Sequence, residues 1–269
     1  LEGKTAIVTG SGRGIGRAVA ELFTQHGARV LINDLDEGPA REAAEELRAK
    51  GAEVAVCAGS VTDADLPDRL VKTALDSFGS IDIIVNNAGY TWDGVIHKMS
   101  DEQFDAMLDV HLKAPFRIVR AASGYLRGEV KKALDEGRQP PCRKIVNVSS
   151  TSGVAGNAGQ INYAAGKMGV VGMTKTIAKE WGRFNVCCNA VAYGFIETRL
   201  TQAKEKGDAT STGIALGIPQ APRDMAPNFI PLGRTGTPED AAGPVLFLAS
   251  PLSDFVTGAV VLVTGGMVM

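Results

Sequence analysis

Short apolar runs alternate with longer amphipathic stretches along almost the whole chain. The apolar runs are rich in β-branched residues, as buried strands are, and predict strands at 5–8, 29–33, 53–57, 81–85, 144–148, 186–191 and 260–263. Helical periodicity between them predicts helices after residue 14 and over 39–50, 64–78, 100–125, 163–182 and 237–249. This alternation predicts an α/β fold, in which a doubly wound sheet of seven parallel strands carries helices on both faces.

Three segments qualify this pattern. The helix at 100–125 begins with a capping-box pattern at Ser100 and Gln103, and Pro115 is expected to bend it. Residues 127–143 are charged and contain glycines and prolines, which indicates a solvated helix extension and a loop. Residues 201–231 contain four prolines and little periodicity. Because long irregular segments in compact domains often bind ligands, we expect 201–231 to be a substrate lid.

Composition narrows the class of protein. The 269 residues suit a single domain over 1–269, and 28 basic against 30 acidic residues argue against nucleic-acid binding. We find no apolar run long enough to span a membrane and no export signal at the start. Four cysteines without a C-x-x-C motif are expected to be reduced, mostly buried thiols, and three scattered histidines suggest no metal site. These observations favour the cytoplasm.

A glycine-rich turn follows the first strand directly. Thr9-Gly10-Ser11-Gly12-Arg13-Gly14-Ile15-Gly16 separates that strand from an amphipathic helix. Glycines permit positive φ and a close ligand approach, and a helix N-terminus offers free N–H groups to a phosphate. The spacing differs from the G-x-G-x-x-G dinucleotide fingerprint, so a plain glycine-rich turn is the alternative. The flanking strand and helix favour a Rossmann-type phosphate-binding turn.

Asp34 ends the second predicted strand, 18 residues after Gly16. An acidic residue about 20 residues past such glycines commonly accepts a hydrogen bond from a ribose 2′-OH, which favours NAD over NADP. A loop aspartate is the alternative, and Asp36 and Glu37 are adjacent competitors. The position at the end of a strand favours Asp34.

A second motif combines a hydroxyl, a phenol and an ammonium. Ser150 ends the fifth predicted strand, Tyr163 follows 13 residues later, and Lys167 stands four residues after Tyr163. Residues four apart share one face of a helix. An ammonium nearby is expected to lower the pKa of the phenol, making it a usable acid or base near neutral pH. The alternative is a surface helical pair.

The predicted topology brings these motifs together. In a doubly wound sheet, ligands bind outside the carboxyl ends of the strands. The glycine turn, the turn at Asn86, Ser150 and Gly194 all follow strand ends. We therefore expect one site at this edge of the sheet.

The combined motifs resemble the short-chain dehydrogenase/reductase family over nearly the whole chain. The resemblance rests on the glycine turn, Asn86-Asn87-Ala88-Gly89, Ser150 and Tyr163-x-x-x-Lys167. Further segments, Gly159-Gln160-Ile161-Asn162 before Tyr163 and Pro231-Leu232-Gly233-Arg234, are most similar to the 3-oxoacyl-acyl-carrier-protein reductase branch.

The resemblance implies roles for single residues. Tyr163 would donate the proton, Ser150 would orient the carbonyl, and Lys167 would lower the phenol pKa and hold the nicotinamide ribose. Cofactor contacts are implied for the glycine turn with Arg13 and Ile15, and for Asp34, Val61, Asn87, Ala88, Gly89, Tyr163, Lys167, Gly194, Ile196 and Thr198. Arg13 argues for NADP, because relatives that use NADP often carry a basic residue there; we weigh Asp34 above it.

Two departures from the family pattern concern the site. His111 replaces an asparagine that would hold a water in a proton relay. The histidine either keeps the relay, with more pH sensitivity, or simply packs. Tyr193 replaces a proline before Gly194, and its ring either lines the nicotinamide pocket or packs.

The sequence therefore predicts an NAD-dependent oxidoreductase, with NADP as the alternative cofactor. The leading substrate is a 3-oxoacyl thioester carried on acyl carrier protein or coenzyme A. Sugars, steroids and small alcohols are alternatives, as is a nucleotide-binding protein without catalysis. By resemblance, and from apolar Val170, Val171 and Met173, we expect a homotetramer.

Overall fold

The computed structural model describes residues 1–210 and 213–269, and within them the seven predicted strands form one parallel sheet. Its order is β3-β2-β1-β4-β5-β6-β7. The chain starts in the middle of the sheet, builds toward β3, and then returns to add β4 beside β1. The strands are β1 (Thr5–Val8), β2 (Arg29–Ile32), β3 (Val54–Val56), β4 (Ile83–Asn86), β5 (Arg143–Ser150), β6 (Val186–Tyr193) and β7 (Val260–Val263).

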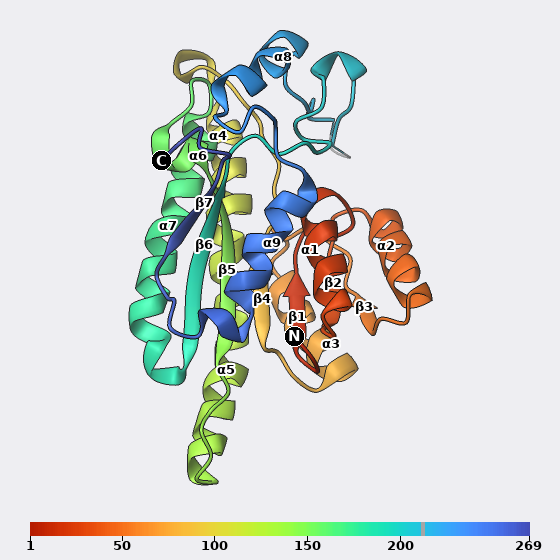
Figure 1. Cartoon of the computed structure of the whole chain (residues 1–269), viewed down its shortest axis with the longest axis vertical. Coiled ribbons are helices and arrows are strands. Elements are labelled where there is room, and N and C mark those ends of the chain that lie inside the picture. Colours follow the sequence, from red (N-terminus) through yellow and green to blue (C-terminus); the bar gives the residue numbers. More distant parts are fainter. Residues whose placement is uncertain (211–212) are drawn as a thin grey trace.

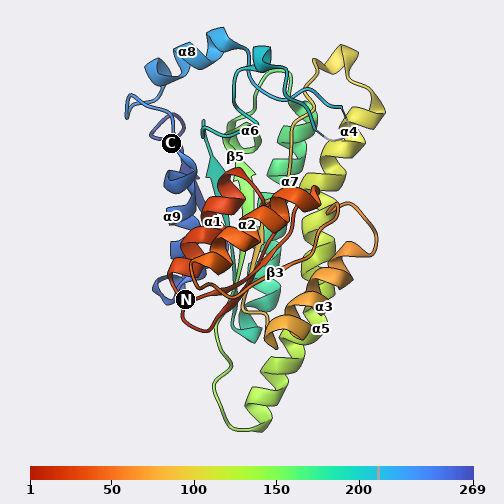
Figure 2. The ribbon, with the colours of Figure 1, turned by 90° about the vertical axis from the view of Figure 1, so that its right-hand side faces the viewer.

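Helices cover both faces of the sheet (Figures 1 and 2). Successive strand residues point to opposite faces, so Ala6 and Val8 enter one apolar core while Ile7 enters the other. The first core lies under α1 (Gly14–Gln25), α2 (Glu37–Ala49) and α9 (Pro238–Ala249). The second lies under α3 (Leu66–Phe78), α5 (Ala114–Asp135) and α7 (Ile161–Trp181). This two-sided burial confirms the predicted fold class.

The helix expected over 100–125 is divided in the structure. α4 (Asp101–Leu108) passes through a π-helical turn, Asp109–Lys113, into α5, which has Pro115 in its first turn. Because proline lacks an N–H, it fits that first turn better than a helix interior. The helix then continues to Asp135, ten residues beyond the expected end. No helix within the described ranges has both the length and the apolar character to cross a bilayer.

The expected lid segment contains more structure than the sequence indicates. A helix, α8 (Gln220–Phe229), follows a single 3₁₀ turn, Lys204–Lys206, and lies above the carboxyl end of the sheet (Figure 1). Prolines within α8 hide its periodicity from sequence analysis. Positions 211 and 212 of this segment lie outside the described residues.

Tyr193 belongs to the core between the sheet and α9. Its side chain is 5% exposed, and its hydroxyl donates a hydrogen bond to the carbonyl oxygen of Ala241 at 3.0 Å. Of the two interpretations left open by the sequence, this geometry favours packing. The hydrogen bond of the Tyr193 side chain therefore joins β6 to α9.

The apolar residues used to predict a homotetramer do not form an exposed face. Val170 and Val171 are buried within their own chain, and Met173 is half-buried. They contribute to the fold, and the prediction of an oligomer needs a different surface.

Replacing Tyr193 by phenylalanine should lower the free energy of unfolding by about 1 kcal/mol, because the Ala241 carbonyl loses its partner. Turnover and the KM for the cofactor should stay close to those of the parent. Urea unfolding and steady-state kinetics measure both quantities. Unchanged stability with a raised cofactor KM would contradict the packing role.

Candidate active site

The glycine turn after β1 is shaped by close backbone contacts. Gly10 and Gly14 have positive φ, +62° and +55°. A Cβ on Gly10 would lie 2.7 Å from the Cα of Ala88, and one on Gly16 would lie 2.2 Å from the carbonyl oxygen of Gly10. Real side chains do not tolerate such separations, so these positions require glycine.

The N-terminus of α1 opens onto this turn. Its N-cap residue, Arg13, has extended backbone, and within the described residues no N-cap side chain or first-turn acid satisfies the first N–H groups. Such groups, with the positive end of the helix dipole, bind phosphate. Thr198 faces the turn from the segment after β6, with its methyl 3.6 Å from where a Gly14 Cβ would stand. The space and the donors therefore fit a dinucleotide pyrophosphate.

Asp34 is fixed beside the glycine turn. Its Oδ2 accepts a hydrogen bond from the Gly12 N–H at 3.0 Å, and its Oδ1 accepts one from the Asp36 N–H at 3.2 Å. The two competing acids form ion pairs with side chains. Asp36 pairs with Arg13 of the turn at 2.9 Å, and Glu37 pairs with Arg41 on α2. Of the three, Asp34 is the carboxylate that accepts a backbone N–H of the turn.

The turn after β4 locks onto the glycine turn. The side-chain amide of Asn87 donates to the carbonyl oxygens of Thr9 (2.9 Å) and Gly10 (3.0 Å). The Asn87 and Ala88 N–H groups donate to Thr9 Oγ1 at 3.0 and 3.1 Å. Both side-chain amide hydrogens of Asn87 are thus donated to backbone carbonyls, and the side chain holds the two turns together.

The other predicted cofactor residues lie around the same edge. Gly89 packs against the imidazole of His111, and Val61 is buried in the second core. Gly194 follows β6 and lies against Thr264, while Ile196 is buried and bridges to Gly236. The predicted convergence of the strand ends is confirmed.

Ser150, Tyr163 and Lys167 form a cluster in which Ser150 and Lys167 are buried and Tyr163 is half-buried. Ser150 is the N-cap of α6 (Thr151–Ala155), and its Oγ accepts the Ser152 N–H at 3.1 Å. The Ser150 hydroxyl acts on the Tyr163 phenol and lowers its pKa. Lys167 Nζ donates to the Val148 carbonyl at 2.8 Å and lies 5.5 Å from the Tyr163 ring centroid. The two side chains share one face of α7.

Burial dominates the electrostatics of this cluster. It raises the pKa of Tyr163 to about 12, an effect that the Ser150 hydrogen bond partly offsets and the charge of Asp93 reinforces. Burial also lowers the pKa of Lys167 to about 7. The phenol pKa is thus raised and not lowered, because desolvation disfavours the phenolate and outweighs the other contributions. The phenol holds its proton near neutral pH.

His111 stands at the edge of the Tyr163 ring. The π-helical turn places it there, 2% exposed, with ring centroids 4.8 Å apart and planes at 89°. Burial and the charge of Lys167 hold its pKa well below 6.5, so the imidazole is neutral. Its Nε2 lies 2.7 Å from the Tyr90 carbonyl oxygen and must donate to it, which leaves Nδ1 as a buried acceptor without a partner among the described residues. A pKa lowered in this way argues against the added pH sensitivity expected from the sequence.

Sequence reasoning missed Asp93. The two oxygens of its carboxylate accept from Gln160 Nε2 at 3.1 and 3.0 Å. Gln160 Oε1 in turn accepts from Ser152 Oγ at 2.8 Å and from Asn157 at 2.9 Å. Only the position of Asp93 shortly after the Asn86 turn could have indicated it, because no recognisable motif includes it.

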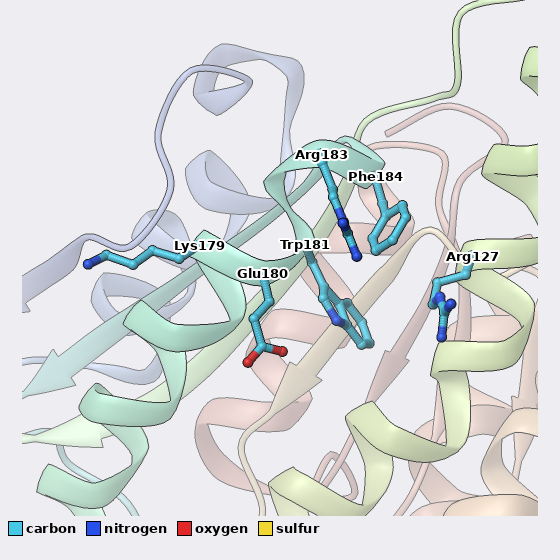
Figure 3. A pocket seen from close by; sticks show the side chains of 6 residues that line it. All are labelled: Arg127, Lys179, Glu180, Trp181, Arg183 and Phe184. Atoms are coloured by element: carbon cyan, nitrogen blue, oxygen red, sulfur yellow. The ribbon is translucent and has the colours of Figure 1, made fainter.

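A surface hollow at the other end of α7 lies away from this cluster (Figure 3). Trp181 is 18 residues after Tyr163, or about 27 Å along the helix. Two guanidiniums stack on one ring in the hollow, since Arg183 and Arg127 lie 4.7 and 5.6 Å from the centroid of Phe184.

Within the described residues, no group of three or more His, Cys, Asp or Glu side chains is arranged to hold a metal ion.

Comparison with known proteins places this arrangement in a family. The profile of a family described as enoyl-(acyl carrier protein) reductase matches residues 10–268. A 3-oxoacyl-[acyl-carrier-protein] reductase from Thermotoga maritima is 39% identical, with 100% of this chain and 99% of the relative covered. Proteins of the same name from Vibrio harveyi and Salmonella typhimurium are 40% and 35% identical at the same coverage. The chain therefore belongs to the short-chain dehydrogenase/reductase family and is a nicotinamide-dependent oxidoreductase.

Proposed function

We propose that the protein reduces the ketone of a 3-oxoacyl thioester to the secondary alcohol. The observation that carries the proposal is the cluster of Ser150, Tyr163 and Lys167 at the same edge of the sheet as the glycine turn. The names of the full-length relatives support the substrate class.

Each residue of the cluster has a separate task in this proposal. Ser150 Oγ receives the Ser152 N–H, so its own hydrogen is available to the ketone oxygen. Negative charge develops on that oxygen, and a fixed donor in a buried site stabilises it. Tyr163 then gives the oxygen its proton. Lys167, held by the Val148 carbonyl, lies close enough to support the phenolate that remains. The nicotinamide, when bound, supplies the hydride.

One activity screen tests the substrate class. The enzyme is given a 3-oxoacyl group on acyl carrier protein, on coenzyme A and on a short thiol, together with a sugar ketone, a steroid ketone and a small ketone, and NADH or NADPH absorbance is followed. We expect the highest kcat/KM for a thioester, and the first two substrates distinguish the carriers. Higher kcat/KM for any of the other ketones would overturn the thioester assignment.

We propose NAD(H) as the preferred cofactor. A carboxylate held by the Gly12 N–H has little freedom to move away, so Asp34 accepts from a 2′-OH and repels a 2′-phosphate. Arg13 pairs with Asp36, which partly neutralises its attraction for that phosphate.

We propose that His111 holds a water of the proton relay to Tyr163. Its neutral ring offers Nδ1 as an acceptor in a buried place, and an unmet acceptor there is costly unless a donor such as water reaches it.

We propose that a second copy of the chain covers the outer side of β7. That edge strand is only half-buried, whereas β5 and β6 are buried throughout. The fully exposed Phe255, with Leu252 at 81% exposure, extends this uncovered apolar area. Exposed apolar patches of this kind mark association surfaces, and closed symmetric assemblies such as the expected homotetramer are the usual result.

Tyr163→Phe should lower kcat by about 10²–10⁴-fold, because it removes the proton donor, while the cofactor Kd stays nearly unchanged. Tyr125→Phe is the matched control, since it makes the same change on α5 away from the cluster. Steady-state kinetics and cofactor titration supply the two readouts. Turnover within a few-fold of the parent would eliminate Tyr163 as the proton donor.

Asp34→Ala should shift the ratio of kcat/KM values toward NADP(H), because it removes both the hydrogen bond and the repulsion. Asp76→Ala, an exposed change on α3, should leave the ratio unchanged. The proposal fails if the parent already prefers NADP(H) or if the ratio does not move.

His111→Asn should keep most of the activity, because its amide also offers an acceptor, whereas His111→Ala should lower kcat more. The parent should show no ionisation of His111 near pH 6.5, since its pKa lies well below that value. Measured pH–rate profiles of the three proteins test this. Equal rates in the parent and the alanine variant would indicate a packing role.

Sedimentation should give an assembly well above the 28.1 kDa of one chain at micromolar concentration. Phe255→Glu should weaken the assembly, while Leu134→Glu, an equally drastic change on exposed α5, should not. A parent that sediments only as a monomer would contradict the homotetramer, and an assembly insensitive to Phe255→Glu would move the interface elsewhere.

A further inference from the structure

Asp93 lies at the end of a hydrogen-bond chain that reaches the candidate catalytic serine. Its carboxylate receives the Gln160 amide nitrogen, the Gln160 oxygen receives the Ser152 hydroxyl, and the Ser152 N–H is donated to Ser150 Oγ. Ser152 is buried and Gln160 is half-buried. This series of hydrogen bonds links the loop after β4 to the end of β5.

The charge of Asp93 fixes which way the Gln160 amide points. An ionised carboxylate only accepts hydrogen bonds, so it must face the –NH₂ end of the amide. The Gln160 oxygen is then turned toward Ser152 and Asn157, both of which donate to it. A flipped amide would leave Asp93 facing an oxygen and the Asn157 –NH₂ facing another –NH₂, so the contacts with Asp93 and Asn157 would be lost.

Backbone contacts surround this chain and give it a fixed frame. The Gly94 N–H donates to the Gly159 carbonyl at 2.8 Å, and the Asn162 amide donates to the Trp92 carbonyl at 3.0 Å. Asn162 Oδ1 also accepts the N–H of Tyr163 at 2.8 Å. The loop that carries Asp93 is therefore joined to the first turn of α7 on both sides of the carboxylate.

We propose that Asp93 is a positioning residue, which through Gln160 and Ser152 holds the Ser150 hydroxyl in the geometry that the substrate ketone requires. This inference rests on the proposed function of Ser150 and Tyr163. It assigns to the loop after β4 a part in catalysis that is distinct from its contact with the glycine turn.

The negative charge of Asp93 adds a second, separable effect. Partial desolvation raises the pKa of Asp93, which lies at the exposed end of these contacts, while Gln160 and the charge of Lys204 lower it. Asp93 in turn helps to raise the pKa of Tyr163. The titratable groups coupled to it are therefore Lys204 from the lid segment and Tyr163 from α7. Removing the charge should therefore ease ionisation of Tyr163, whatever happens to the hydrogen-bond chain.

Two substitutions at Asp93 separate position from charge. Asp93→Asn keeps an oxygen that can accept from Gln160 but removes the charge. Asp93→Ala removes both. Gln160→Ala breaks the chain while leaving the charge, and Asp105→Asn, an exposed change on α4, is the matched control. Kinetics in both reaction directions, pH–rate profiles, cofactor titration and thermal unfolding are measured on the full chain.

We expect Asp93→Ala and Gln160→Ala to lower kcat by roughly tenfold to a hundredfold, as misplacement of a catalytic group does, with an unchanged cofactor Kd. Asp93→Asn should recover most of kcat. In the direction of alcohol oxidation, its rate should rise at lower pH than that of the parent, because an uncharged neighbour lets the phenol ionise more easily.

Two results would overturn the inference. One is a kcat for Asp93→Ala equal to that of the parent, and the other is an Asp93→Asn variant whose pH profile matches the parent and whose kcat falls only in step with lost thermal stability. If Tyr163→Phe is inactive, either result rejects only the positioning role of Asp93 and leaves the proposed function in place. An active Tyr163→Phe would instead reject the proposed function.

Discussion

The contact between the turn after β1 and the turn after β4 is the constraint on which the site depends. β1 ends at Val8 and β4 begins only at Ile83, but the two strands are neighbours because the chain leaves the middle of the sheet and returns to it. At that switch point the backbone of Gly10 lies so close to Ala88 that no side chain fits between them. Thr9 and Asn87 then tie the two turns together with side-chain to backbone hydrogen bonds.

This contact positions groups on both sides of it. On one side it sets the N-terminus of α1, with its free N–H groups, against the end of β2, where Asp34 is held. On the other side it fixes the start of the loop that carries Asp93 and, through Gly89, the wall against which His111 packs. A shift at Gly10 would therefore reach the glycine turn, Asp34 and the surroundings of Tyr163 together.

Sequence analysis predicted the elements whose signals are local. β-Branched runs gave the strands, and the capping residues at Ser100 and Thr237 marked two helix starts that the structure has. It missed α8, because prolines interrupt its apolar period, but it did indicate the charged, solvated extension of α5 without giving the residue where that extension ends. The motif residues at the strand ends could be brought to one edge by topology alone.

What the sequence could not give is the protonation state and the hydrogen-bond partner of each side chain. The spacing of Tyr163 and Lys167 suggested a charged lysine acting on a phenol, but how deeply both are buried depends on the whole fold. The same limit applies to His111, whose neutrality follows from its burial next to Lys167. It applies equally to Asn87, which ties backbone groups and does not face outward, and to Tyr193, whose hydroxyl finds α9.

Desolvation of the Tyr163 cluster bears on the proposed proton transfer. At pH 7 a phenol with a pKa of about 12 keeps its proton, whereas an amine with a pKa of about 7 is protonated in about half of the molecules. Donation becomes favourable only when negative charge develops on an oxygen beside Ser150, which is what happens to a ketone as it accepts hydride. Asp93 strengthens this bias by opposing the phenolate, whereas a proton taken up from an alcohol requires the phenolate first. In the proposed reaction, the desolvation that disfavours the phenolate would keep the proton on Tyr163 until charge develops on the ketone oxygen.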